Sequence, residues 1–219
     1  MIRRLIFILC AGILLTVFLW SGQEIVTRLS EYQTARSEYI QLREQLDIPA
    51  EISVEAENEE SIEDINFDVL YAINPDVVAW IIVSGTTINY PVVQGADNEW
   101  YLRHTFSGQR NASGAIFLDY RNNPDFSDTH TLIHGHNMQD GSMFSSLEEW
   151  GGDWFIIHRP NETLEYKVFN RQIVSANHEL YVIPNTIAGS REQVVTLSTC
   201  VSGRSYLRYV VQGRLFESN

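Results

Sequence analysis

The chain has 219 residues, 44% of them hydrophobic and 11% aromatic, which suits one domain with a real core plus an appendage. Its formal net charge of -13 at pH 7 argues against nucleic-acid binding, which requires a basic surface to neutralise phosphates. The same charge makes the surface a poor match for anionic lipid.

The N-terminus carries an apolar segment. Arg3 and Arg4 precede residues 5–20, which contain no charged side chain. Two small residues extend this run toward the roughly 20 that span a bilayer, and Trp20 stands where an interfacial aromatic residue belongs. Because positive charge favours the cytoplasmic side, we predict that residues 1–22 form a cytoplasmic stub and a single-pass anchor, with the rest of the chain outside. A cleaved signal peptide is the alternative, although the run offers no clear small-x-small cleavage site.

A polar segment follows the predicted anchor. Residues 23–46 carry spaced apolar side chains and read as a helix leaving the membrane. Half of residues 51–64 are acidic, a composition that cannot bury a core and is typical of a solvated linker. A functional acidic patch is the other interpretation of this block. We predict that residues 23–66 form a helical stalk and an acidic linker.

The character of the sequence changes at Asn66, after which β-rich runs alternate with turn residues. Short helices are predicted over residues 67–73 and 143–150. Many short strands with turn chemistry between them favour a closed barrel or a sandwich, and we assign residues 67–219 to one extracytoplasmic domain. The predicted strands cover residues 77–83, 87–93, 114–119, 129–134, 154–157, 164–174, 193–197 and 209–215.

The two cysteines are predicted to lie in different environments. Cys10 falls inside the apolar anchor and Cys200 near the end of the chain, so they cannot pair. Secreted chains normally use cysteines in disulfides, and a lone extracytoplasmic thiol therefore indicates a reactive one. A buried, inert cysteine is the alternative.

Cys200 ends a β-rich run, where rigid backbone can hold a side chain that faces a cleft. A free thiol has a pKa of about 8.5 and needs a base or a cation nearby to act as a nucleophile. His136 ends another strand-like run, and Arg208 begins the predicted final strand. If the strands of Cys200 and Arg208 pair as a hairpin, both side chains reach one end of the sheet. The fixed donors of an arginine suit an oxyanion better than proton transfer.

Three histidines share one strand parity. His130, His134 and His136 alternate in a pattern that can hold zinc. Gly135 and the lack of an obvious carboxylate shell count against that interpretation, and we predict no metal. His130 and His134 are then expected at the surface or in the wall of a groove.

Residues 196–200 read TLSTC and resemble the TLxTC active-site motif of sortases. Residues 133–144, 74–94 and 114–120 resemble, in the same order along the chain, segments of the class B sortases, the first of them the segment around the catalytic histidine. The single N-terminal anchor is also what that family uses. From about Phe67 onward the chain is thus similar to a membrane-anchored cysteine transpeptidase of the sortase family, class B.

The resemblance implies a mainly β fold, a sortase-type closed β-barrel of about eight strands with a few short helices, preceded by the transmembrane helix and the stalk. It assigns the nucleophile to Cys200, the general acid/base to His136 and the oxyanion stabiliser to Arg208. Arg204, in the loop before the last strand, is the reserve candidate for that role. Positions that bind the sorting signal fall on Ser198, Asn98 and Thr199.

The implied reaction is cleavage of a C-terminal sorting motif of the LPxTG or NPxTN kind in a secreted protein. The acyl group then passes to an amine of the cell wall or of a pilin, with no cofactor. One departure concerns the segment before the cysteine. Class B enzymes usually carry a long helix-bearing insertion there, whereas only residues 177–192 are available here, so the preferred motif is left open.

Two other functions remain to be weighed. The first is a cysteine peptidase that only hydrolyses. In papain-like enzymes the cysteine precedes the histidine, and the reverse order here counts against that group. The second is a non-catalytic, envelope-anchored β-domain that binds a surface partner and has no need of Cys200.

Overall fold

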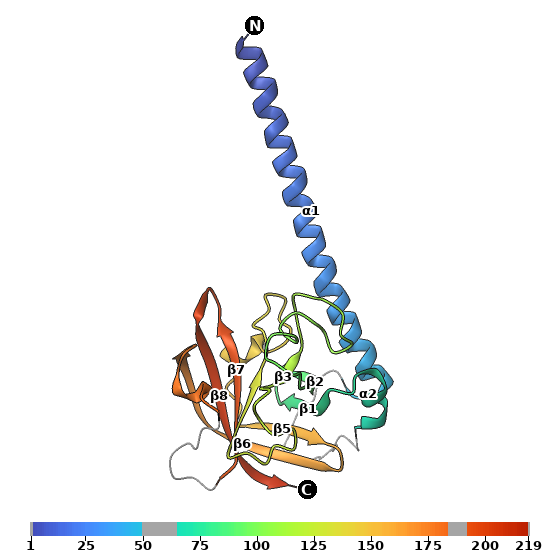
Figure 1. Ribbon diagram of the computed structural model, residues 1–219, viewed down its shortest axis with the longest axis vertical. Coiled ribbons are helices and arrows are strands. Elements are labelled where there is room, and N and C mark those ends of the chain that lie inside the picture. Colours follow the sequence, from blue (N-terminus) through green and yellow to red (C-terminus); the bar gives the residue numbers. More distant parts are fainter. Residues whose placement is uncertain (1, 50–64, 184–191, 219) are drawn as a thin grey trace.

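The computed structural model describes residues 2–49, 65–183 and 192–218, so most of the predicted acidic linker lies outside the described residues. One helix, α1 (Ile2–Gln45), runs unbroken through the predicted anchor and the predicted stalk (Figure 1). Its apolar part is long enough to cross a membrane, and none of that window is buried against protein. A signal sequence would pass the same test of length and composition.

The C-terminal part of α1 packs on the barrel. Ala35, Tyr39 and Leu42 are buried and recur at the spacing of one helix face. The Tyr39 ring meets the Tyr90 ring edge-on, with centroids 5.0 Å apart. Its hydroxyl donates to the Gly114 carbonyl at 3.2 Å. The end of α1 is therefore part of the folded core.

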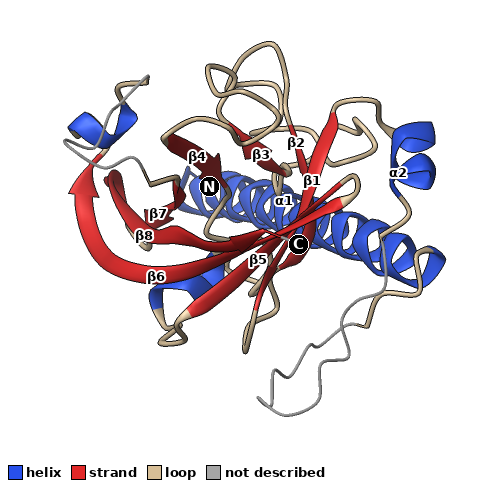
Figure 2. Ribbon diagram, turned by 90° about the horizontal axis from the view of Figure 1, so that it is seen from below, coloured by secondary structure: helices blue, strands red, loops and turns tan. Residues whose placement is uncertain are grey.

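Eight strands close into a barrel in the order β1-β2-β3-β4-β7-β8-β6-β5, which confirms the predicted fold (Figures 1 and 2). The pairs β2–β3 and β4–β7 are parallel, and the other pairs are antiparallel. The strands are β1 (Val77–Val83), β2 (Asn89–Val93), β3 (Ile116–Leu118), β4 (His130–His134), β5 (Trp154–Arg159), β6 (Glu162–Ser175), β7 (Val194–Val201) and β8 (Arg204–Ser218).

The helices of the barrel domain are short, and they are α2 (Phe67–Ile73) and the 3-10 helices η1 (Ser145–Glu148) and η2 (Glu179–Tyr181) in the described residues. The helix predicted over 143–150 shrinks to η1. Met143 has φ 56°, a left-handed conformation that a right-handed helix cannot include. The helix can therefore begin only after that residue.

Strand β7 separates two environments. Val195 and Leu197 point into the apolar core of the barrel. Because side chains alternate along a strand, Thr196, Ser198 and Cys200 point to the outer face. The outward row is polar, as expected for a wall whose outer side forms a site.

The hairpin between β7 and β8 is tighter than predicted. Val201 pairs with Arg204, which leaves a two-residue turn at Ser202 and Gly203. Gly203 has φ 70° at the second position of the turn, a left-handed value that favours glycine. Arg204 therefore lies in strand β8, and its predicted place in a loop was wrong.

Candidate active site

Cys200 and Arg208 face each other across the β7–β8 hairpin. The two residues are direct partners in the antiparallel register, so their side chains share the outer face of the sheet. The register shifts between Cys200 and Val201, and a bulge at this point re-aims the neighbouring side chain. Cys200 is a half-buried free thiol.

The Arg208 guanidinium is braced against its own hairpin. Nη1 donates to the Ser205 carbonyl at 2.6 Å and to the Leu207 carbonyl at 3.0 Å. These contacts keep the cation at the end of the hairpin that carries Cys200. Arg204 is exposed and lies next to the turn, so Arg208 is the arginine placed opposite the thiol.

His136 comes to this end of the sheet because β4 runs parallel to β7. The Gly135 amide donates to the Ser198 carbonyl at 3.1 Å, and Asn137 Nδ2 donates to the Cys200 carbonyl at 2.9 Å. His136 stands between these two tethers. His136 just after β4, Cys200 on β7 and Arg208 on β8 therefore lie at the same end of the sheet.

The His136 ring has a defined partner in the Leu102 carbonyl, which is 2.8 Å from Nε2. A carbonyl oxygen only accepts, so Nε2 carries the hydrogen and Nδ1 is the nitrogen left to gain or lose a proton. The backbone at Gly135 packs closely on Ile116 and Phe144. A Cβ on Gly135 would lie 2.5 Å from Ile116 Cδ1 and 2.7 Å from Phe144 Cδ2, so only glycine fits beside His136. The sequence carries no signal for the Leu102 contact.

His130 was wrongly predicted to lie at the surface or in a groove wall. Its residue is 1% exposed, and Nε2 lies 2.8 Å from Thr196 Oγ1. An inner strand is covered on both faces. Asn122, in the turn that precedes β4, fastens that turn to the start of the strand by donating to the His130 carbonyl at 2.8 Å. Burial lowers the pKa of His130 to about 4, because an apolar surrounding disfavours the charged ring.

The three histidines do not form one metal site. His130 bonds Thr196, and His134 Nε2 lies 3.1 Å from Asp119 Oδ2. Six residues of extended chain separate His130 from His136, which is about 20 Å. No single ion can bind rings so far apart.

Residues 81–216 match the sortase domain, a span that covers more than half of the chain and includes the three candidate residues Cys200, His136 and Arg208. The chain belongs to the sortase family. It is therefore a cysteine transpeptidase, as the motif predicted.

Similar proteins place this sortase in class B. Sortase B of Listeria monocytogenes serovar 1/2a is 31% identical over 177 residues, which cover 67% of this chain and 72% of that one. The crystal structure of sortase B from Bacillus anthracis matches with a TM-score of 0.69 at 28% identity and covers 86% of this chain and 99% of that one. A Streptococcus pyogenes class B sortase described as involved in pilus biogenesis matches with a TM-score of 0.63 at 30% identity, over 69% of this chain and 98% of that one.

Two of the predicted groove residues of this sortase lie on opposite faces of β7. Ser198 points outward, is 2% exposed, and lies with Oγ 2.7 Å from the Tyr181 hydroxyl. Thr199 is also 2% exposed but points to the other face by strand alternation. A contact from Thr199 to a substrate could therefore come only from its backbone.

The third predicted groove residue is already engaged at both ends of its amide. Asn98 Nδ2 donates to Asp119 Oδ2 at 2.8 Å, and Asn98 Oδ1 accepts from the Tyr120 amide at 3.0 Å. The loop between β2 and β3 is thereby tied to the end of β3.

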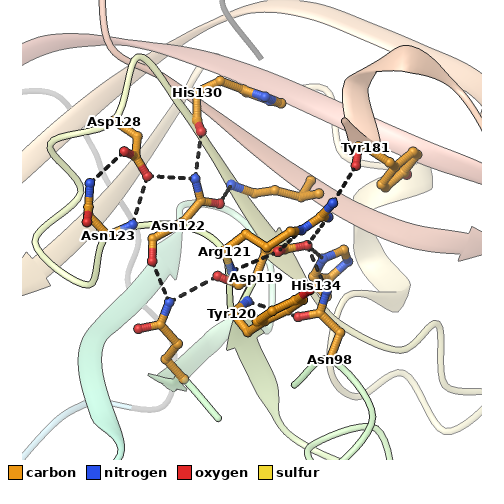
Figure 3. Close-up of polar contacts among 12 residues, drawn as sticks. Asn98, Asp119, Tyr120, Arg121, Asn122, Asn123, Asp128, His130, His134 and Tyr181 are labelled. Carbon is orange, nitrogen blue, oxygen red and sulfur yellow. Dashed lines mark hydrogen bonds and ion pairs between the residues drawn. The ribbon is translucent and has the colours of Figure 1, made fainter. Parts of the chain in front are cut away.

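Asp119 was not among the predicted site residues of this sortase, yet the side chains of three residues, Asn98, Arg121 and His134, bond its carboxylate (Figure 3). Burial alone would raise the pKa of this carboxyl. The Arg121 guanidinium and the His134 ring outweigh that effect and hold the pKa well below its usual range. One signal was available in the sequence, since an acidic residue directly follows the buried strand β3.

Proposed function

We propose that this sortase cleaves a C-terminal sorting motif of the LPxTG or NPxTN kind in secreted proteins and transfers them to an amine of the cell wall or of a pilin. The supporting observation is the register that sets Cys200 opposite Arg208, with His136 held beside them by tethers to β7. In this proposal Cys200 is the nucleophile, His136 is the general acid/base and Arg208 stabilises the oxyanion.

In the first half-reaction the Cys200 thiolate attacks the carbonyl carbon of the motif's threonine. The carbonyl electron pair moves to oxygen, where the Arg208 guanidinium and nearby backbone N–H groups stabilise the negative charge. The carbon–nitrogen bond then breaks. The His136 imidazolium gives its proton to the departing amine, which leaves a thioester on Cys200.

In the second half-reaction an acceptor amine attacks the thioester carbon. Neutral His136 takes a proton from that amine, a new amide forms, and the Cys200 thiolate is released. The two halves exchange one amide for another with no net oxidation. The chemistry therefore implies no cofactor.

We propose that residues 1–22 anchor the enzyme with its N-terminus in the cytoplasm, that residues 23–66 serve as stalk and linker, and that residues 67–219 act outside the cell. The support is the apolar part of α1, which is not buried against protein. An anchored enzyme meets secreted substrates at the membrane face, where both are concentrated. The relative described as involved in pilus biogenesis supports keeping a pilin lysine among the possible acceptors.

The test is a peptide-library assay with the full chain in detergent micelles. Mass spectrometry reads the cleavage point, and triglycine or a lysine-bearing peptide serves as the acceptor. We expect cleavage after the threonine of one motif class and an amide-linked product with the amine. Hydrolysis with no amine product would support a cysteine peptidase. Partner binding and biological function that survive Cys200→Ala would support the non-catalytic β-domain.

A further inference from the structure

A buried carboxylate lies beside the site at the end of β3. The Asp119 residue is 0% exposed. The Arg121 side chain forks onto it, with Nε 2.8 Å from Oδ1 and Nη2 2.8 Å from Oδ2. The Arg121 amide adds a third contact to Oδ1 at 3.1 Å. Such a paired, fork-shaped contact fixes the guanidinium in one plane.

Two further segments converge on the same carboxylate. Asn98 Nδ2, from the β2–β3 loop, donates to Oδ2 at 2.8 Å. His134 Nε2, from β4, lies 3.1 Å from the same oxygen. The His134 ring also stacks on Phe117, with centroids 5.0 Å apart, so its orientation is fixed from two sides. Figure 3 shows Asn98, Arg121 and His134 arranged around Asp119.

Arg121 extends the network to the connection between β6 and β7. Its Nη1 donates to the Tyr181 carbonyl at 3.0 Å. The Tyr181 hydroxyl then lies 2.7 Å from Ser198 Oγ. Ser198 is two residues before Cys200 on the same face of β7. A continuous chain of contacts therefore runs from Asp119 to the outer face that carries the thiol.

The described part of this connection also packs on a small apolar cluster of Val174, Leu180 and Val210. The Ala176 amide donates to the Tyr206 carbonyl at 3.0 Å, and the Tyr181 ring stacks on His134 with centroids 6.4 Å apart. The described part forms the three-residue η2 and no longer helix. The charge-assisted contact from Arg121 adds to these contacts and links the segment to Asp119.

We propose that Asp119 is the positioning residue of the sorting-signal groove. Its carboxylate holds Asn98 and His134 directly. Through Arg121 it also holds Tyr181, so that all three groups keep the arrangement that selects the peptide. This inference rests on the proposed function, because it assigns the basis of peptide selection to a residue that touches neither the scissile bond nor the thiol.

Three variants of the full chain in detergent micelles test it. Asp119→Asn keeps the shape but removes the charge and presents an N–H to surrounding donors. Arg121→Lys keeps the charge but cannot fork onto Asp119 and reach Tyr181 at once. Asp128→Asn is the matched control. Its carboxylate holds the neighbouring turn through Asn122 and Asn123 and bonds no groove residue.

The first readout is kinetic, with the best library peptide and the same peptide altered at one motif residue. We expect Asp119→Asn to lower kcat/KM by up to about 100-fold, mainly through KM, and to lower the preference for the cognate peptide. Arg121→Lys should lose preference with a smaller loss of rate, and Asp128→Asn should stay within about twofold. The rate of Cys200 alkylation by iodoacetamide should change less than about twofold in all three, because the thiol lies outside the network.

The second readout is hydrogen exchange of residues 176–182, which requires no substrate. We expect faster exchange there in Asp119→Asn and Arg121→Lys than in Asp128→Asn. Unchanged kinetics and unchanged exchange in the first two variants would overturn the inference, as would equal losses in the control. If the wild type cleaves no peptide, the proposed function fails, and exchange alone decides the positioning role. If Asp119→Asn does not fold, Arg121→Lys carries the test.

Discussion

The two ends of the β4–β7 pair carry similar residues in opposite surroundings. At one end His130 faces Thr196, and the two are 1% and 0% exposed. At the other end His136 stands beside Cys200, and both are half-buried. Each end sets a histidine from β4 or just after it beside an outward-facing residue of β7.

The difference teaches that exposure decides which histidine can act. We call the end with His130 and Thr196 the closed end and the end with His136 and Cys200 the open end. At the closed end, burial lowers the pKa of His130 to about 4, so the ring stays neutral and bonds a hydroxyl. At the open end, His136 has one nitrogen on the Leu102 carbonyl and the other left for proton transfer. The closed end supports the barrel, and the open end is suited to chemistry.

The largest expected effect comes from removing the thiol at the open end. Cys200→Ala should abolish peptide turnover, with at least a 10³-fold loss on the order of other nucleophile deletions, because no other group can form the thioester. Thermal unfolding should change little, since one sulfur at a strand end contributes little packing. Thr196→Val at the closed end is the control, and it should leave the chemistry intact while costing about 1–3 kcal/mol of stability through its lost hydrogen bonds. Activity above about a tenth of wild type in Cys200→Ala would end the nucleophile assignment.

The second effect separates the two histidines. His136→Ala should lower kcat by about 10²–10⁴-fold and flatten one limb of the pH–rate profile, because that limb reports its proton. Iodoacetamide should still label Cys200 in this variant. His130→Gln should keep both limbs of the profile. A profile unchanged by His136→Ala would remove this residue from the mechanism and make His134 the next candidate.

The third effect concerns the cation at the open end. Arg208→Ala should cost about 10²–10³-fold in kcat, the usual loss for one oxyanion donor. Arg208→Lys should recover only part of that, since a lysine lacks the planar fork. Arg204→Ala, one short stretch earlier in the same strand, should stay within a few-fold of wild type. The assignment is wrong if the Arg204 variant loses more activity than the Arg208 variant in the same peptide assay.

The last effect is on stability rather than on rate and belongs to the closed end. The folded pKa of His130 is about 4, below the unfolded value of about 6.5. The folded state thus favours the neutral ring. The contribution of His130 to the free energy of unfolding is fully present above pH 6.5 and is lost as the pH falls to 4. We expect a loss of about 3 kcal/mol across that window, measured by urea unfolding. His130→Gln should flatten it. The carboxyl of Asp119 contributes in a separate, lower range, because its pKa is held below the usual value.

Much of the fold followed from local pattern. The eight strands were predicted from β-rich runs bounded by turn residues, because strands rich in β-branched and aromatic side chains pack into a common core. Boundaries failed where a single backbone angle decides them, as at Met143 before η1 and at Gly203 in the β7–β8 turn. The angle at Met143 depends on the surrounding packing and leaves no local mark in the sequence, whereas the glycine at 203 is itself a turn signal.

The site was predictable to the extent that its residues end strands. Cys200 and His136 both stand where a β-rich run stops, and the motif around each named its role. Strand alternation alone indicates that Thr199 points away from Cys200. The contact between His136 and the Leu102 carbonyl and the contacts around Asp119 depend on how loops from distant parts of the chain approach β4. No short sequence pattern contains that information.

The helix α1 runs unbroken from the apolar N-terminal part to the residues that pack on the barrel. A helix rises about 1.5 Å per residue, so roughly 20 Å separate Gly22 from Ala35, the first of the buried stripe. With the apolar part of α1 in a bilayer, the barrel stands on a short rigid post. Figure 1 shows that the β7–β8 hairpin points toward the end of the barrel from which the N-terminal part of α1 departs. Cys200 would then lie at a short, fixed distance above the lipid surface. A substrate would have to bring its sorting motif to that height before it could react.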